Sequence, residues 1–146
     1  MTDILSATRG IIVHQVNCQG VMGAGIALQI RQKWPKVYQR YRNFKFKLGQ
    51  IQIVKITDDL YVCNLAGQDQ YGRDKRYTDY EALRIGFTKL NTYASAKNFP
   101  VYIPKFMGCS NAGGDWKVVS QIISETLSTC KITICEKAGG KERRTL

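Results

Sequence analysis

Two glycine-rich segments carry the residue types that are best suited to binding an anion. The first, residues 17–28, follows an apolar run at 11–16, and the second, residues 105–116, follows another apolar run; each opens a helical pattern. Glycines allow several backbone N–H groups to point into one concavity, and a helix N-terminus adds a partial positive charge. Ligands of open α/β sheets bind at the carboxyl ends of the strands. We therefore expect both segments to hold a phosphate-containing ligand there.

The familiar nucleotide-binding motifs do not account for the first segment. Its glycines, Gly20, Gly23 and Gly25, have the spacing Gly-x-x-Gly-x-Gly, which is the reverse of the dinucleotide fingerprint. A P-loop requires Lys and then Ser or Thr after its last glycine, where this chain has Ile26 and Ala27. A single glycine-rich turn is often only structural, but two such segments in one chain of 146 residues favour a shared ligand.

Two titratable residues flank these segments and are candidates for acid–base chemistry. His14 is the only histidine and stands in the apolar run before the first segment. Its near-neutral pKa suits general acid–base catalysis if the ring reaches the cleft, and the alternative is a buried core residue. Asp115 ends the second segment, where it is either a base that orients water or the N-cap of the last helix. Both roles of Asp115 are compatible.

The cysteines argue against a metal centre and against a disulfide framework. There are five, an odd number, with irregular spacing and no Cys-x-x-Cys pair, and one histidine cannot build a His-rich site. Free thiols are typical of a reducing compartment. Residues 1–10 do not have the pattern of a secretion signal, and no apolar run approaches the roughly 18–20 residues of a membrane span. We expect a cytoplasmic protein with no metal, no cofactor and no membrane partner.

The formal net charge of +11 is unevenly distributed along the chain. Residues 1–57 contain nine basic residues and one acidic residue, a balance that attracts anionic partners. Within them, residues 31–47 interleave seven basic residues with aromatic residues, a composition that suits single-stranded nucleic acid. The aromatic residues are Trp34, Tyr38, Tyr41, Phe44 and Phe46. The first three also have the spacing of a buried helix stripe, so a core role is the alternative.

Short β-branched runs alternate with longer helical patterns, which predicts one layered α/β domain over residues 1–146 with a mixed, mostly parallel sheet. Strands are expected at 11–16, 51–56, 60–65, 101–103 and 132–135, with a short additional strand at 3–5. Helices are expected at 25–33, 36–44, 78–97 and 115–128. Thr78, with Glu81 three residues later, is the expected N-cap of the longest helix. Asp58 and Asp59 predict a tight hairpin turn.

Residues 14–27 and 108–116 resemble the two ligand loops of the macro domain family, and residues 34–38 resemble the stretch that follows the first loop. The similarity extends in order from Asp3 to Ile134. The resemblance implies a three-layer α/β/α fold around a mixed, mostly parallel sheet, with a cleft for ADP-ribose. It also implies an enzyme or reader of ADP-ribose, which we expect to be a monomer.

The resemblance assigns roles by position in the two loops. Asn17 would hydrogen-bond the distal ribose, where the chemistry occurs, and Asp3 with Ile4 would contact the adenine. The residues expected around the diphosphate are, in the first loop, Gly20, Val21, Met22, Gly23, Ala24 and Gly25, and in the second loop Gly108, Cys109, Ser110, Asn111, Ala112 and Gly113.

Two departures separate the chain from the glycohydrolase branch that uses a lysine nucleophile. The corresponding loop, residues 66–71, has no lysine, and Ala112 stands where that branch has an aspartate. The phosphatase branch is closer, because some of its members have a histidine before the ribose-binding asparagine, as His14 precedes Asn17. We therefore expect dephosphorylation of ADP-ribose 1''-phosphate. The alternatives are removal of ADP-ribose from protein or nucleic acid, and a binding module without catalysis.

Overall fold

A computed structural model describes residues 3–136, in which five strands form one sheet with the order β2-β3-β1-β4-β5. The strands are β1 (Gly10–Asn17), β2 (Ile51–Lys55), β3 (Leu60–Gln68), β4 (Val101–Pro104) and β5 (Ile132–Cys135). β1 pairs in parallel with both β3 and β4, and β4 pairs in parallel with β5. Only the β2–β3 hairpin is antiparallel in this part of the chain. The mixed, mostly parallel sheet and the hairpin are thereby confirmed.

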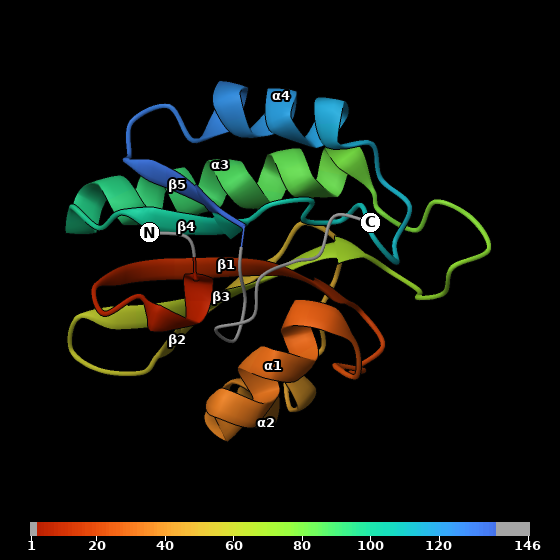
Figure 1. Cartoon of the computed structure of the whole chain (residues 1–146), viewed down its shortest axis with the longest axis horizontal. Helices are drawn as coiled ribbons and strands as arrows, with labels where there is room; N and C mark the ends of the chain where they lie inside the picture. Colours follow the sequence, from red (N-terminus) through yellow and green to blue (C-terminus); the bar gives the residue numbers. More distant parts are fainter. Residues whose placement is uncertain (1–2, 137–146) are drawn as a thin grey trace.

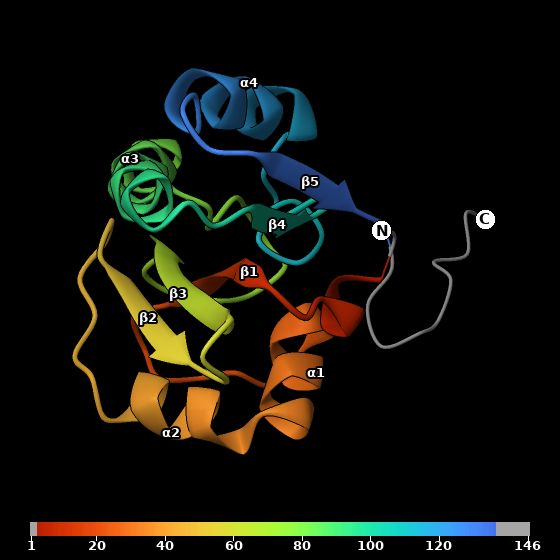
Figure 2. The same ribbon diagram turned by 90° about the vertical axis from the view of Figure 1, so that its left-hand side faces the viewer.

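Helices cover both faces of the sheet and complete three layers. They are α1 (Gly25–Lys33), α2 (Pro35–Arg42), α3 (Tyr80–Lys97) and α4 (Trp116–Thr126). Figures 1 and 2 show α1 and α2 against one face and α3 and α4 against the other. The α/β/α fold is therefore confirmed. The predicted domain boundaries of 1 and 146 lie outside the described residues.

The central strand is buried on both faces, as expected for a strand with parallel neighbours on both sides. Ile11 and Val13 pack into the core with residues of α3 and α4, including Phe87. Ile12 points to the other face and packs into the core with Ile30 of α1 and Val37 of α2. Side chains of β1 thus alternate between the two helical layers, and this alternation decides which polar residues of β1 reach a surface.

Two local predictions were wrong, and in both cases an aspartate explains the difference. Residues 3–5 do not form a strand; Ile4–Ser6 is a 3₁₀ turn, because the Asp3 carboxylate accepts a hydrogen bond from the Leu5 N–H at 3.0 Å. The longest helix begins at Tyr80 because Asp79, not Thr78, caps it: Asp79 Oδ1 accepts from the Ala82 N–H at 2.9 Å.

Two further findings concern membrane spans and the cysteines. Within residues 3–136, no helix is both long and apolar enough to cross a membrane. All five cysteines lie within residues 3–136 and are free thiols; Cys63 and Cys135 are buried.

Gly86 offers a test of how closely α3 packs on the sheet. A Cβ at this position would lie 2.6 Å from Leu65 Cγ on β3. Alanine favours a helix by about 1 kcal/mol over glycine, but overpacking of this kind costs about 1–3 kcal/mol. We expect Gly86→Ala to be destabilising by up to about 2 kcal/mol in urea unfolding, whereas Thr92→Ala on the exposed side of α3 changes stability by less than about 0.5 kcal/mol. A more stable Gly86→Ala would contradict this packing.

Candidate functional site

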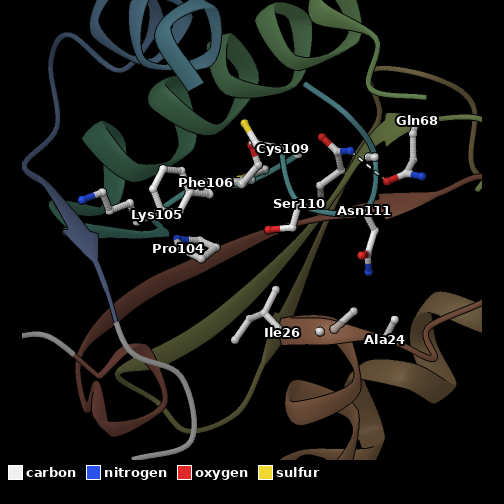
Figure 3. A pocket seen from close by; sticks show the side chains of 15 residues that line it. Ala24, Ile26, Gln68, Pro104, Lys105, Phe106, Cys109, Ser110 and Asn111 are labelled. Carbon is white, nitrogen blue, oxygen red and sulfur yellow. Dashed lines mark hydrogen bonds between the residues drawn. The ribbon is translucent and has the colours of Figure 1, made fainter. Parts of the chain in front are cut away.

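A cavity of about 150 Å³ lies between the start of α1 and the segment that follows β4. Figure 3 shows Ala24 and Ile26 on one side of it and Ser110 and Asn111 on the other. The lining residues come from three places: Gln15 and Gln68 at the ends of β1 and β3, residues 24–27 of the first glycine-rich segment, and residues 104–112 of the second. The two segments therefore border one cavity, as predicted from their sequences.

The residues at the start of α1 line this cavity. The N-cap residue, Ala24, is extended and makes no side-chain capping bond. The first N–H groups of a helix have no partner inside the helix. Gly25, Ile26 and Ala27, which supply these groups, all line the cavity. Together with the helix dipole, this arrangement favours a bound anion.

Asn17 shapes the first segment from within. Its Oδ1 accepts from the N–H groups of Gln19 at 2.9 Å and Val21 at 3.3 Å, and its Nδ2 donates to the Val21 carbonyl at 2.8 Å. The Tyr41 hydroxyl donates to the same Oδ1 at 2.8 Å. Asn17 is only 7% exposed and does not line the cavity. The ribose contact therefore stays a prediction, while the structural role of this amide is observed.

Only the end of the first segment reaches the cavity. Ala24 and Gly25 line it, whereas the four residues before them do not: Gly20, Val21, Met22 and Gly23. The reason is the Met22 side chain, which is 2% exposed and packs against Tyr41 and Phe46 in the core. This anchor fixes the middle of the segment to α2 and leaves its last residues at the cavity.

The second segment supplies the opposite wall through residues 108–112, and Gly113 is not part of the lining. Gly108 has φ +76°, and a Cβ there would lie 2.8 Å from Gln15 Oε1. Its carbonyl accepts from the Thr78 hydroxyl at 2.6 Å and from the Gly114 N–H at 2.9 Å. Thr78 thus holds the second segment in place, which is the role it has instead of capping α3.

Cys109 is the cysteine that lines the cavity. Burial raises the pKa of its thiol to about 11, with a smaller contribution from the charge of Asp115. The thiolate is the nucleophilic form of cysteine, so a thiol with this pKa stays protonated and unreactive at neutral pH.

The sequence analysis missed Gln15, which forms part of the cavity floor. Its Nε2 donates to Gln68 Oε1 at 2.8 Å and to Thr78 Oγ1 at 2.9 Å. Its Oε1 is buried and has no hydrogen-bond partner among the described residues. This oxygen lies against the backbones of Gly67 and Gly108, so it is an unsatisfied acceptor beneath the cavity surface. The available signal was a polar residue near the end of an apolar strand, one residue before the strand meets the glycine-rich segment.

His14 lies on the other face of β1 and does not reach the cavity. It is 0% exposed, and its Nε2 is 2.6 Å from Asn64 Oδ1. Asn64 Nδ2 donates to Gln52 Oε1 at 3.0 Å, so Asn64 Oδ1 is the acceptor and the histidine donates. Burial lowers the pKa of His14 to about 4, which the hydrogen bond to Asn64 only partly opposes. The acid–base role required a ring in the cleft; the structure shows the alternative, a neutral core histidine.

The remaining predicted site residues lie outside the cavity lining. Asp115 Oδ1 accepts from the Lys117 N–H at 2.9 Å, which confirms the N-cap of α4, and the Asp115 carboxylate is exposed directly after the second segment. Asp3 is occupied in capping its 3₁₀ turn, and Ile4 is 0% exposed in the core beneath α1. The contact of these two residues with an adenine therefore stays a prediction.

Known proteins with similar sequences act on ADP-ribose conjugates according to their names. A DNA ADP-ribosyl glycohydrolase of Mycobacterium tuberculosis is 28% identical over 127 residues, which cover 82% of this chain and 35% of that protein. The ADP-ribose 1''-phosphate phosphatase of Saccharomyces cerevisiae is 29% identical over 99 residues, which cover 60% of this chain and 55% of that protein. The chain thus spans about a third of the length of the first curated relatives it matches. No model of a protein family matches it.

Solved structures share the whole fold. A Bacteroides thetaiotaomicron protein of unknown function superposes with a TM-score of 0.84 at 30% identity, covering 92% of this chain and 94% of that one. The macrodomain of Mycobacterium tuberculosis DarG superposes with a TM-score of 0.77 at 25% identity, covering 92% and 93%. The three-layer fold, with one cavity between the two glycine-rich segments, is the arrangement expected from the resemblance to macro domains. The chain belongs to the macro domain family.

The buried His14 predicts a specific pH dependence of stability. In the unfolded chain this histidine binds a proton near pH 6.5, and in the folded chain only near pH 4. Between these values the unfolded state binds more protons, so acid reduces stability. A difference of about 2.5 pKa units corresponds to about 3 kcal/mol lost between pH 6.5 and pH 4.

We expect His14→Gln, which keeps a donor for Asn64 but does not titrate, to lose about 2 kcal/mol less stability than the wild type between pH 7 and pH 4.5. Urea unfolding at the two pH values measures this, and the carboxylates common to both proteins cancel in the comparison. Equal losses in the two proteins would show that His14 is not the titrating group.

Gly108 predicts a second stability effect at the cavity wall. We expect Gly108→Ala to be destabilising by about 1–3 kcal/mol, because the new Cβ meets Gln15 Oε1 and the left-handed backbone disfavours a side chain. Gly23→Ala is the matched control, since a Cβ there has nothing within 4 Å and the backbone φ is not positive. Urea unfolding of both variants tests the close contact. If the two substitutions have the same effect, the contact is absent.

Proposed function

We propose that this macro domain binds ADP-ribose and hydrolyses an ADP-ribose derivative, with ADP-ribose 1''-phosphate as the first choice. The observation that carries the proposal is the single cavity bordered by the N-terminus of α1 and by residues 108–112. Helix N–H groups on one wall and a glycine-rich segment on the other suit a diphosphate. The relatives named for ADP-ribose chemistry support the same ligand.

The size of the cavity supports a position of the diphosphate at its centre. Small-molecule sites usually measure about 300–1,000 Å³, and this cavity of about 150 Å³ is smaller. It therefore accommodates the middle of the ligand, while the two ends extend along its openings. One end passes Ile26, Pro104 and Phe106, whose apolar side chains suit a base. The other end passes Gln15 and Gln68, the polar residues that line the cavity at the ends of β1 and β3 and whose side chains suit a ribose.

We prefer phosphatase to glycohydrolase activity because of the residue that lines the cavity at the end of β3. Gln68 is the lining residue from the loop where the lysine-dependent branch carries its nucleophile. A neutral amide cannot act as that nucleophile. Asp115 is the remaining acidic candidate, because its exposed carboxylate follows directly after the second segment. We assign it the role of a base that orients water, in addition to its capping bond.

Binding of ADP-ribose is tested by calorimetry on the wild type and on a variant with a negative charge added at the cavity. We expect heat of binding for ADP-ribose below about 1 mM, which corresponds to a binding free energy of at least about 4 kcal/mol. Ser110→Glu adds a negative charge at the cavity and should weaken binding about tenfold or more through repulsion of the diphosphate. Ser124→Glu on exposed α4 is the matched control with unchanged affinity. No heat with the wild type at 1 mM would overturn the ligand assignment.

Catalysis is tested by phosphate release from ADP-ribose 1''-phosphate. Asp115→Asn keeps the capping hydrogen bond but removes the base, so we expect turnover to fall about 100-fold or more while stability stays near that of the wild type. His14→Gln should retain wild-type turnover, because its ring is fully buried in the core, whereas the Asp115 carboxylate is exposed. Equal rates for Asp115→Asn and the wild type would exclude Asp115 as the base. Undetectable wild-type turnover would leave a domain that only binds its ligand.

The second candidate, removal of ADP-ribose from DNA, is favoured by the names and similarity of the mycobacterial relatives. It is measured in the same assay with an ADP-ribosylated oligonucleotide. Because Gln68 replaces a nucleophile at the cavity, we expect no release of unmodified DNA at enzyme concentrations that turn over the phosphate ester. If the oligonucleotide were turned over faster than ADP-ribose 1''-phosphate, removal of ADP-ribose from DNA would become the first candidate.

A further inference from the structure

The surface formed by residues 31–47, named here the basic face, carries seven cations without a counter-charge. They are Arg31, Lys33, Lys36, Arg40, Arg42, Lys45 and Lys47. None of them forms an ion pair with a residue in the described range 3–136, where the ion pairs join Lys55 to Asp58, Arg84 to Glu125 and Lys105 to Glu136. Because no acidic residue occurs between Asp3 and Asp58, the sequence offers no local partner either.

The aromatic residues of this segment divide into two groups. Trp34 and Tyr38 pack against the core and Tyr41 is buried, so the stripe predicted as an alternative is confirmed for these three rings. Phe46 is also buried. Phe44 is different, since 42% of it is exposed. One ring therefore remains available on the outside, among the cations.

The cations that stay outside are arranged along α2. The Arg31 and Arg42 guanidinium groups lie over the Tyr38 ring at 3.8 and 5.5 Å, so they are partly held by the protein. Lys36 and Arg40 are exposed, stand one helical turn (about 6 Å) apart and have no ring contact among the described residues. Phe44 follows four residues after Arg40, just past the helix end. Two free cations and an exposed ring thus follow one another along α2.

From this arrangement we infer that the basic face binds the phosphate backbone of single-stranded nucleic acid. A row of unpaired cations contacts successive phosphates, and an exposed ring offers a base a surface for stacking. A duplex keeps its bases stacked internally and leaves Phe44 without a role. An acidic protein partner needs an apolar interface centre, but Phe44 is the large apolar residue of this face with more than a third of its surface exposed, and Leu48 just beyond the face adds one more.

This inference does not rest on the ligand of the cavity. α1 begins at the cavity with Gly25 and spans about 13 Å over its nine residues, so the basic face starts in the last turn of this helix, at the end away from the cavity. Figure 2 shows α2 on the side of the sheet opposite to α3 and α4. A nucleic acid on α2 therefore leaves the cavity open, and binding of an oligonucleotide is measured without ADP-ribose.

The test compares two triple variants of equal net charge. Lys36→Gln/Arg40→Gln/Lys45→Gln removes three cations from the basic face. Lys97→Gln/Lys117→Gln/Lys131→Gln removes three exposed cations from elsewhere on the chain. Fluorescence anisotropy with oligo-dT and oligo-rU of about 15 nucleotides, from about 50 to 200 mM salt, measures affinity and its salt dependence.

We expect the wild type to bind both oligonucleotides within about threefold of each other, with a salt slope of about −3 to −5, since each phosphate contact contributes about −0.7. The basic-face variant should bind at least about tenfold more weakly, with a slope reduced by about 2. The control triple should stay within about threefold of the wild type. Phe44→Ala should weaken binding about fivefold or more without changing the slope.

Several results would overturn the inference. Equal weakening by the two triple variants would assign the binding to net charge and not to this face. The absence of binding at about 50 mM salt would remove the site altogether. Tighter binding of a duplex of the same length would exclude the single-stranded form. A poly-glutamate of equal charge that binds as tightly as the oligonucleotides would assign the face to an acidic protein.

Discussion

The structure depends on the parallel pairing of β1 with β3 on one side and with β4 on the other. In this arrangement the carboxyl ends of all three strands lie at the same edge of the sheet. The three segments that leave this edge supply the lining residues Gln15, Gln68 and residues 104–112, and α1 follows from β1. Any pairing that reversed β4 would carry the second glycine-rich segment to the opposite edge and separate the two walls.

The patterns that predicted this arrangement are those with a strong local cause. Apolar and β-branched runs predicted the five strands to within a few residues, most clearly for β1, because a strand buried on both faces is almost continuously apolar. Two glycine-rich segments, each following a strand and preceding a helix, predicted the cavity walls. The reason is that segments of this kind leave parallel strands at the carboxyl edge of the sheet. Resemblance to macro domains added the order of layers, which the comparisons confirm.

What the sequence did not predict is the direction of individual polar side chains. His14 and Gln15 are neighbours, yet alternation along β1 sends the histidine into the core beside Asn64 and the glutamine to the cavity floor. The pairing of β1 with β3 also shifts by one residue at Gly67, where a Cβ would lie 2.5 Å from Gln15 Oε1. This contact joins residues far apart in the sequence, so no local pattern carries it. The order of residues in the sequence alone could not show which of Gln15 and His14 faces the cavity.

Charge and geometry contribute separately to the two proposed binding sites. The unpaired cations of residues 31–47 repel one another, and only salt or an external anion offsets that repulsion. Their field decays within about 8–10 Å at moderate salt, so at the far end of α1 it attracts any polyanion without selecting one. Selection at the cavity requires groups that act over hydrogen-bond distances, such as the backbone N–H groups at the start of α1 and the polar side chains of the lining. A positive net charge is therefore no argument for ADP-ribose, and the converging segments are no argument for nucleic acid; each site stands on its own contacts.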